Sequence, residues 1–274
     1  MTTSAPRPVE ADPATGEIDV VVSDRVEDID EALSVIHDGF VEAGYMDPQP
    51  SGRRMHPSYL NPGTMFLVAR IDGEPVGASV FISDGPFGLP SDRAFAEENG
   101  LLRARTEHLL HEAGSLVVLS SHRRSTRRIV MRLFAALTRM ALKEFPAAAV
   151  PMVVAPENER FYGSLLGARK IGAERPLFGA PAILLLTGGA AAAAHCSQRA
   201  TPSQRRMDAL LTEPGPSWLT DRRAHRPPPA AWLEALLDEQ GLTQTLASQI
   251  QLLSERCPEA LANVLRRART SMVA

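Results

Sequence analysis

The hydrophobic positions of this chain follow two periods, which indicates a mixture of strands and helices. Apolar runs too short for independent helices occur at 18–22, 65–70, 76–83, 116–119, 149–155, 168–173 and 183–187. Between them, apolar residues recur every three or four positions from Ile29, from Ile129 to Leu137 and from Phe161 to Leu166, and a turn at 84–90 leads into a further helical stretch at 91–105. The short runs are typical of strands and the three- or four-residue spacing is typical of helices. The pattern predicts one α+β unit with mostly antiparallel hairpins and one strand–helix crossover.

Turn signals place the ends of several elements. Asp72-Gly73 predicts a hairpin between two strands, and Gly167 predicts the end of a helix. Asp28 is a candidate cap for the first helix. The segment 45–64 carries four prolines, and a loop of this length usually covers or binds something. We expect it to form a lid.

Composition divides the chain into three parts. Residues 1–16 lack periodicity and predict a disordered lead-in. The main domain spans 17–188, and 189–274 predicts a linker followed by an α-helical C-terminal extension. Amphipathic spacing from Trp232 onward suggests helices that pack on the main domain or form a homodimer.

Charge and composition exclude several classes of protein. The formal net charge of −3 argues against nucleic acid as a partner. No apolar run approaches the roughly 18 residues of a transmembrane segment, and the N-terminus lacks the apolar core of a secretory signal. Two distant cysteines favour neither a disulfide framework nor zinc, so we expect a cytoplasmic protein. His108, His111 and His122 lack a ligand spacing, and we expect no metal.

The stretch 112–139 combines the short apolar run 116–119, a polar turn and an amphipathic helix. Four arginines gather in that turn: Arg123, Arg124, Arg127 and Arg128. A helix N-terminus attracts anions, so the cluster predicts a phosphate or an acidic partner. The alternative is a solvated basic surface without a ligand.

These pieces, in this order, resemble the GNAT acyltransferase superfamily. One anchor is the strand, basic turn and helix at 112–139, and the other is Asn158 with Tyr162 and Gly167 in NERFYGSLLGA. Within that superfamily, residues 44–48, 72–74, 88–92 and Glu112 resemble N-acyl amino acid synthases of the FeeM type, relatives of the acyl-homoserine-lactone autoinducer synthases. The resemblance covers about 18–187 and implies the GNAT fold, a central mixed, mostly antiparallel sheet flanked by helices.

The resemblance also implies an acyl-phosphopantetheine donor and no permanently bound cofactor. Common relatives wrap the pyrophosphate of coenzyme A with glycines after the central strand, whereas the turn here, HRRSTRR, has none. Without glycine, close approach of the backbone is hindered. Arginines suit a single phosphodiester and an acidic protein surface. Acyl carrier protein is therefore the expected donor, with acyl-CoA as the alternative.

Site roles follow from the same resemblance. Glu112 is expected to be the general base and Tyr162 the acid that protonates the leaving thiolate. Backbone groups of Val118, Leu119 and Ser120 are expected to pair with the pantetheine arm, which Asn158 would steady unless it only caps its helix. Tyr45, Arg53 and Arg54 are candidates for binding the amine substrate, with an arginine pairing an amino-acid carboxylate. Ser115 stands where relatives often carry a basic residue.

Three functions remain open from the sequence. The first is transfer of a long-chain acyl group to an amino acid or a similar amine. The second is a homoserine-lactone synthase. Members of that family have several tryptophans near the N-terminus, whereas the two tryptophans of this chain, Trp218 and Trp232, both lie in the tail. The third is a GNAT-like domain without activity that acts as a binding or scaffolding module.

Overall fold

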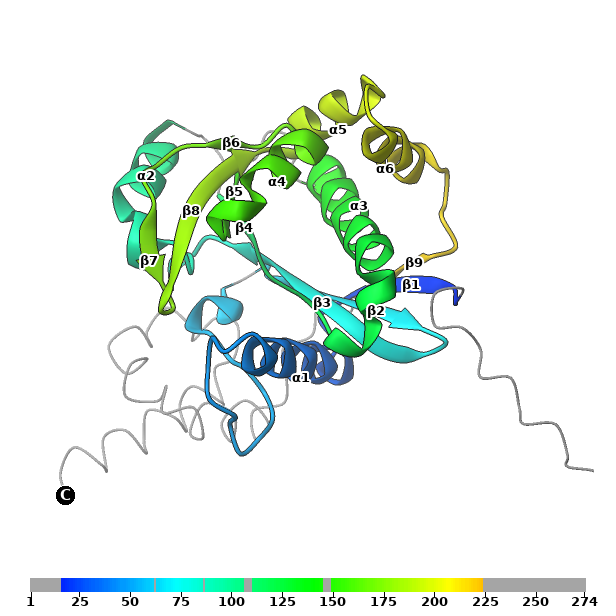
Figure 1. Cartoon of the computed structure of the whole chain (residues 1–274), viewed down its shortest axis with the longest axis horizontal. Helices are drawn as coiled ribbons and strands as arrows, with labels where there is room; N and C mark the ends of the chain where they lie inside the picture. The colour runs from blue at the N-terminus through cyan, green and yellow to red at the C-terminus, as the bar shows by residue number, and fades with distance from the viewer. Residues whose placement is uncertain (1–15, 62, 86, 106–109, 145–148, 224–274) are drawn as a thin grey trace, which may run out of the picture.

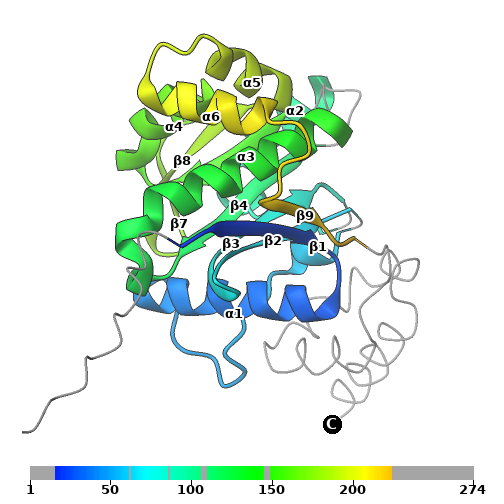
Figure 2. The same ribbon diagram turned by 90° about the vertical axis from the view of Figure 1, so that its right-hand side faces the viewer.

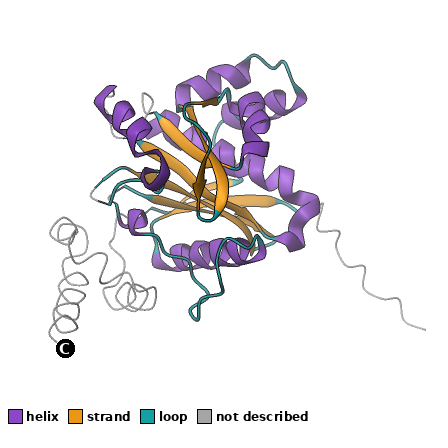
Figure 3. Cartoon of the chain, turned by 60° about the vertical axis from the view of Figure 1, so that its left-hand side comes forward, coloured by secondary structure: helices purple, strands orange, loops and turns teal. Residues whose placement is uncertain are grey.

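Antiparallel strands form the centre of the molecule, in a computed structural model that describes residues 16–61, 63–85, 87–105, 110–144 and 149–223 (Figures 1 and 3). One sheet has the order β4-β3-β2-β1-β9 and the other has the order β5-β8-β6, with β7 paired to β8. All pairs are antiparallel except β1 with β9. The strands are β1 (Ile18–Ser23), β2 (Met65–Ile71), β3 (Glu74–Ser83), β4 (His111–Val118), β5 (Val150–Val154), β6 (Arg169–Lys170), β7 (Arg175–Leu177), β8 (Ala180–Thr187) and β9 (Leu219–Asp221).

Helices cover both faces of the five-stranded sheet. Figure 2 shows α1 on one side, α3 on the other, and α5 and α6 outermost beyond α3. The α-helices are α1 (Val26–Glu42), α2 (Asp92–Arg105), α3 (Thr126–Glu144), α4 (Glu159–Leu166), α5 (Gly189–Ser197) and α6 (Pro202–Thr212), and the 3-10 turns are η1 (Pro57–Leu60), η2 (Ser120–Ser125) and η3 (Pro156–Asn158). The predicted mostly antiparallel sheet flanked by helices is confirmed, and the described helices and strands span 18–221.

The alternation along β2 explains why this strand is almost wholly apolar. Leu67 and Ala69 pack in the core beneath α3, whereas Phe66 and Val68 pack in the core beneath α1. Successive side chains of a strand point to opposite faces, so a sheet covered on both sides buries both sets. The hairpin from β2 to β3 turns at Asp72 (φ 53°) and Gly73 (φ 88°), as the sequence predicts.

Two local expectations differ from the structure. Asp28 does not cap α1, which begins at Val26 behind Arg25; the Asp28 carboxylate instead accepts a hydrogen bond from Arg70 at 2.9 Å. The central strand β4 begins at His111, before the predicted apolar run, because His111 and Glu112 are buried despite being polar. Glu112 therefore lies inside the strand.

Residues 189–223 form part of the folded body, although their composition predicts a linker. Helices α5 and α6 pack against α3 and α4, and β9 adds a parallel strand beside β1. Trp218 is 2% exposed and its backbone oxygen accepts from Val20 N at 2.7 Å. The predicted helices from Trp232 onward lie outside the described residues.

Candidate active site

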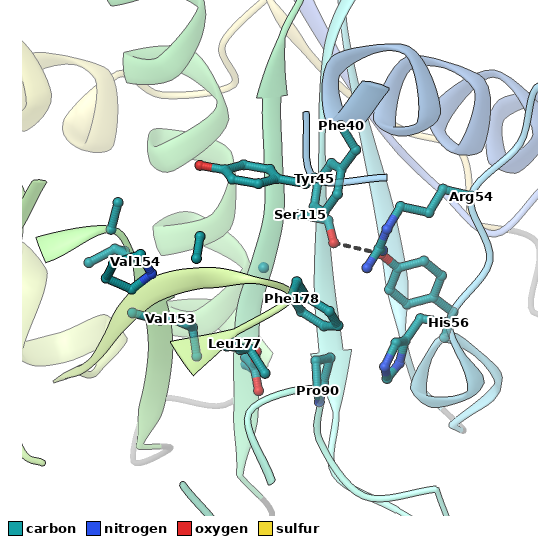
Figure 4. Close-up of a pocket in the computed structure, with 17 residues that line it drawn as sticks. Phe40, Tyr45, Arg54, His56, Pro90, Ser115, Val153, Val154, Leu177 and Phe178 are labelled. Carbon is teal, nitrogen blue, oxygen red and sulfur yellow. Dashed lines mark hydrogen bonds between the residues drawn. The ribbon is translucent and has the colours of Figure 1, made fainter. Parts of the chain in front are cut away.

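A cavity of about 140 Å³ lies where β4 separates from β5 (Figure 4). His111 N still donates to Ala149 O at 3.3 Å near the start of the two strands. Beyond that point β4 pairs with β3 and β5 pairs with β8, so the two sheets diverge. The lining residues come from these strands, from α1 and from the loop after it: Phe40, Tyr45, Arg54, His56, Tyr59, Pro90, Glu112, Gly114, Ser115, Val153, Val154, Ala155, Leu177, Phe178, Ala180, Pro181 and Ala182.

Glu112 is the buried carboxyl group of this cavity. It is 2% exposed, and its Oε2 accepts a hydrogen bond from Ser91 N at 3.0 Å. Burial raises the pKa of Glu112 to about 7, although the hydrogen bonds from Ser91 act in the opposite direction. A carboxyl group with this pKa exchanges protons readily near neutral pH.

A polar cluster at the start of α2 holds Ser91 in place. Asn99 Nδ2 donates to Ser91 Oγ at 2.7 Å and to Asp92 Oδ1 at 2.8 Å. Arg103 pairs with both Asp84 and Asp92, at 2.6 and 2.7 Å. Ser91 and Asn99 are fully buried, so a buried hydrogen-bond network holds the residue that donates to Glu112.

Another part of the cavity wall is formed by aromatic rings around one guanidinium. The carbon Cζ of Arg54 lies 4.2 Å from the ring centre of Phe40 and 5.4 Å from that of Phe178. Phe178 (φ 51°) and Gly179 (φ 79°) form the tight turn between β7 and β8, which projects the phenyl ring over the cavity. Burial, together with the charges of Arg54 and Arg93, lowers the pKa of His56 to about 4, so His56 is neutral at pH 7.

The predicted substrate-binding residues separate into two groups. Tyr45 and Arg54 line the cavity, as expected for a loop that covers a pocket. Arg53 lies outside the lining and pairs with Asp30 on α1, its Nε donating to Oδ1 at 2.9 Å. A guanidinium that is already paired with a carboxylate is a poor partner for a substrate carboxylate, so Arg54 is the better candidate.

Tyr162 and Asn158 both lie outside the cavity lining. Tyr162 packs edge-on against Phe134 and Phe161, with ring centres 5.3 and 5.4 Å away, and burial raises the pKa of Tyr162 to about 12. Asn158 is exposed at the start of α4 and makes no side-chain capping bond. Capping therefore does not account for Asn158, and the proposed roles of both residues remain predictions.

The arginine turn stands at the outer end of β4. Arg123, Arg124 and Arg127 are exposed, and Arg127 Nη2 donates to Ser203 Oγ on α6 at 2.7 Å. Arg128 is half-buried, and its Nη2 donates to Gly16 O at 2.9 Å. The basic cluster thus presents three exposed side chains, two on η2 and one on the first turn of α3.

Two of the predicted pantetheine-binding amides already have partners. Leu119 N donates to Val76 O at 3.0 Å, within the pairing of β4 with β3. Ser120 N donates to the carboxylate of Glu42 at 3.0 Å. Val118 pairs with Gly77, and a Cβ added at Gly77 would come within 2.9 Å of Val117 O. A donor that uses the Ser120 amide must displace Glu42.

Sequence reasoning missed several cavity residues. His56 and Tyr59 lie in the predicted lid, whose proline content was the only signal for them. Phe178 follows a weak strand and carried no signal. The sequence showed that Ser115 stands where relatives often carry a basic residue, but it indicated no role for the serine. In the structure Ser115 adopts φ 51°, and its hydroxyl lies 2.6 Å from Tyr59 Oη (dashed in Figure 4).

Comparisons with known proteins agree with this architecture. The solved structure of FeeM, an N-acyl amino acid synthase from uncultured soil microbes, is 20% identical, with a TM-score of 0.54 over 72% of this chain and 98% of that one. BjaI, a CoA-dependent acyl-homoserine lactone synthase, is 15% identical, with a TM-score of 0.53 over 75% of this chain and 93% of BjaI. The acyl-homoserine-lactone synthase LasI is 14% identical, with a TM-score of 0.51 over 64% of this chain and 91% of LasI. These similarities show a shared fold. No curated protein matches the chain.

In the part of the chain that is described, no helix is long and apolar enough to cross a membrane. The model of the family described as N-acyl amino acid synthase FeeM matches residues 31–187, which include β4, the cavity and the arginine turn. This match covers more than half of the chain and excludes the interpretation as an inactive binding module. The chain belongs to the FeeM family of N-acyl amino acid synthases and is an acyltransferase with a GNAT fold.

Proposed function

We propose that this enzyme transfers a long-chain acyl group from acyl carrier protein, or from acyl-CoA, to the amino group of an amino acid or a similar amine. The observation that carries the proposal is Glu112, a buried carboxyl group in the cavity between the diverging strands, whose pKa burial raises to about 7. A group of this kind accepts a proton from an amine without being fully protonated at neutral pH.

The reaction balances with the groups present. The amine nitrogen attacks the thioester carbonyl carbon, the π electrons move to the carbonyl oxygen, and Glu112 takes the proton that the nitrogen loses. Collapse of the tetrahedral intermediate breaks the C–S bond, and the thiolate leaves with its electron pair. The proton held by Glu112 is then returned to the thiolate or to solvent. The products are an N-acyl amine and a free thiol.

Tyr162 fits hydrogen bonding to the thiolate better than full proton transfer. A thiol ordinarily has a pKa of about 8.5, whereas burial raises the pKa of Tyr162 to about 12. Transfer of the phenolic proton would therefore be unfavourable by about 3.5 pKa units. We propose that Tyr162 donates a hydrogen bond to the sulfur and keeps its proton.

Arg54 supports an acceptor that carries a carboxylate. Its Nη1 donates to Tyr59 Oη at 2.9 Å, and the aromatic rings of Phe40 and Phe178 hold its guanidinium. Bidentate pairing with a carboxylate uses two N–H groups of an arginine, which has five. The α-carboxylate of an amino acid would place its amino group in the same cavity as Glu112.

The exposed arginines support a donor carried on an acidic protein. Among the described residues, the side chains of Arg123 and Arg124 make no hydrogen bond or ion pair, so both guanidinium groups are available to a phosphodiester or to carboxylates. The turn also lacks the glycines that would let the backbone wrap a pyrophosphate. We therefore favour acyl carrier protein over acyl-CoA.

The first test is release of free thiol from palmitoyl-loaded acyl carrier protein in the presence of pooled amino acids, followed by mass spectrometry of the products. We expect one class of N-acyl amino acid, with kcat/KM rising through about pH 7 as Glu112 ionises. Glu112→Gln should lower kcat by about 10²- to 10⁴-fold. Glu97→Gln, an exposed carboxylate on α2, is the matched control. Equal turnover by the Glu112→Gln variant and the wild-type enzyme would exclude Glu112 as the base.

A second test separates the donors. Arg123→Glu with Arg124→Glu should raise the KM for acyl carrier protein by about 10-fold or more and weaken its salt dependence, with a smaller effect on acyl-CoA. Arg25→Glu with Arg105→Glu makes the same change in net charge at exposed positions elsewhere. If both double variants have the same KM for the carrier, the turn is not its docking site.

A further inference from the structure

The strand that carries Glu112 contains a bulge at the cavity. Opposite β4, the single residue Ser79 of β3 faces two residues, Ser115 and Leu116. In a regular strand, side chains three positions apart point to opposite faces. The extra residue breaks this alternation and brings Ser115 to the cavity beside Glu112, since both side chains line it.

The bulge holds Ser115 in a conformation that serine rarely adopts. Its φ is 51°, in the left-handed region that favours glycine. The carbonyl of Gly114 accepts a hydrogen bond from Ser79 Oγ at 3.0 Å. This bond gives the carbonyl a partner at the position where the strand pairing is irregular. Strained residues of this kind persist where the surrounding structure fixes them, and they concentrate at functional sites.

A chain of hydrogen bonds sets the direction of the Ser115 hydroxyl. Arg54 can only donate, so at 2.9 Å the oxygen of Tyr59 is the acceptor. Tyr59 is 3% exposed, and within the described part of the chain the acceptor available to its own O–H is Ser115 Oγ at 2.6 Å. Since a buried phenol that left its proton unpaired would be destabilised, Tyr59 donates and Ser115 accepts. The proton of Ser115 is left for the cavity.

Arg54 strengthens this series of hydrogen bonds from Arg54 through Tyr59 to Ser115, which we call the relay. The positive guanidinium polarises the Tyr59 hydroxyl, which in turn makes the Ser115 hydroxyl a stronger donor. Phe40 and Phe178 fix the guanidinium from two sides. The donor is therefore oriented before any substrate arrives, which is the arrangement that stabilises charge developing in a transition state.

We propose that Ser115 is a catalytic residue whose hydroxyl donates to the thioester carbonyl oxygen and stabilises the oxyanion of the tetrahedral intermediate. The inference rests on the proposed acyl transfer. Glu112 accepts the proton of the attacking nitrogen, and Ser115, on the same side of β4, binds the oxygen that gains charge in that attack. The step moves no proton from Ser115.

Kinetics test this role. Ser115→Ala and Ser115→Gly both remove the hydroxyl, and glycine also relieves the strain of the positive φ. Both should lower kcat by about 10²-fold with little change in KM, because the lost hydrogen bond strengthens only in the transition state. Ser79→Ala removes a hydroxyl from the same bulge outside the cavity lining and should slow turnover far less. Wild-type kcat in both Ser115 variants, or an equal loss in all three, would overturn the role.

The relay makes a separate prediction for Tyr59. Tyr59→Phe removes the group that orients Ser115 and should slow turnover in the wild-type background. In the Ser115→Ala background it should have little further effect, because the two residues act on the same hydrogen bond. Multiplicative losses in the double variant would show that Ser115 acts without the relay.

A spectroscopic readout separates this inference from the proposed function. In a ketone analogue of acyl-pantetheine, CH₂ replaces the sulfur, so no acyl transfer can occur. The infrared stretch of its ¹³C-labelled carbonyl should lie at lower frequency in the wild-type complex than in the Ser115→Ala complex. Equal frequencies, with both proteins bound to the analogue and the wild type active on thioesters, would overturn the Ser115 role alone. Absence of wild-type binding and turnover would overturn the proposed acyl transfer, and the Ser115 role with it.

Discussion

At the scale of single residues, Glu112 places a titratable group at a buried position, with only 2% of its surface exposed. Its pKa is raised from 4.5 to about 7, mainly by burial. The folded state therefore holds a proton that the unfolded state has already released between these two values. The free energy of unfolding contributed by this group falls as pH rises through that window and is lost above pH 7. The base is thus maintained at a cost in stability.

This cost predicts an effect of Glu112→Gln on stability as well as on activity. Glutamine does not titrate, so the free energy of unfolding of the variant relative to wild type should increase by about 2 to 3 kcal/mol between pH 5 and pH 8. Urea unfolding of both proteins at the two pH values measures the difference, and contributions from all other groups cancel. A difference that stays constant with pH would mean that Glu112 is ionised in the folded protein at both values.

At the scale of elements, α1 and β4 meet through a carboxylate at the basic turn. Glu42, the last residue of α1, accepts from Ser120 N at 3.0 Å at the start of the turn that carries Arg123 and Arg124. A phosphodiester that binds this turn would meet a negative charge already in place. Like charges in contact oppose each other, so donor binding must move Glu42.

Removal of this carboxylate should therefore favour the donor. We expect Glu42→Ala to lower the KM for the acyl donor by about threefold to tenfold, because a surface charge interaction contributes on the order of 1 kcal/mol. Glu27→Ala, an exposed glutamate in the first turn of the same helix, is the control. Steady-state kinetics at low salt provide the measurement. A higher KM for the Glu42 variant would instead show that the carboxylate supports the turn.

At the scale of the whole molecule, residues 189–223 complete the core. Trp218 lies beneath Arg132, whose guanidinium is 4.6 Å from the indole ring, and its Nε1 donates to Glu213 at 2.9 Å. Cys196 and Met207 are fully buried in the same core as α3. The acyltransferase fold of this chain therefore depends on a segment beyond the residues matched by the family model.

Trp218→Ala should accordingly destabilise the whole domain. We expect a loss of about 3 to 5 kcal/mol in the free energy of unfolding, from lost burial and the cavity left behind. Leu101→Ala, at a side chain that is 57% exposed on α2, should change it by less than about 0.5 kcal/mol. Urea unfolding followed by circular dichroism gives both values. If the two variants unfold alike, the segment only covers a surface that is stable without it.

Features that depend on local pattern could be predicted from the order of the amino acids alone. Period-two and period-3.6 spacing located most strands and helices, Asp72-Gly73 located a hairpin, and Gly167 ended α4 with φ 64°. Glu112 and the arginines were found because their residue types and order resemble a family. These features depend on residues that are close together in the sequence, so they can be predicted without the folded structure.

The contacts between side chains from distant parts of the sequence could be known only from the folded chain. Arg54 and Arg53 are adjacent in sequence, yet Arg54 reaches the cavity whereas Arg53 pairs with Asp30, because successive residues in a loop point in different directions. Ser115 reaches Tyr59, 56 positions away, only through a bulge that depends on pairing with β3. Likewise, the alanine-rich segment after β8 contributes Ala192 and Cys196 to the core because one face of it packs against α3. Burial and pairing between distant segments are properties of the folded chain, so no local pattern encodes them.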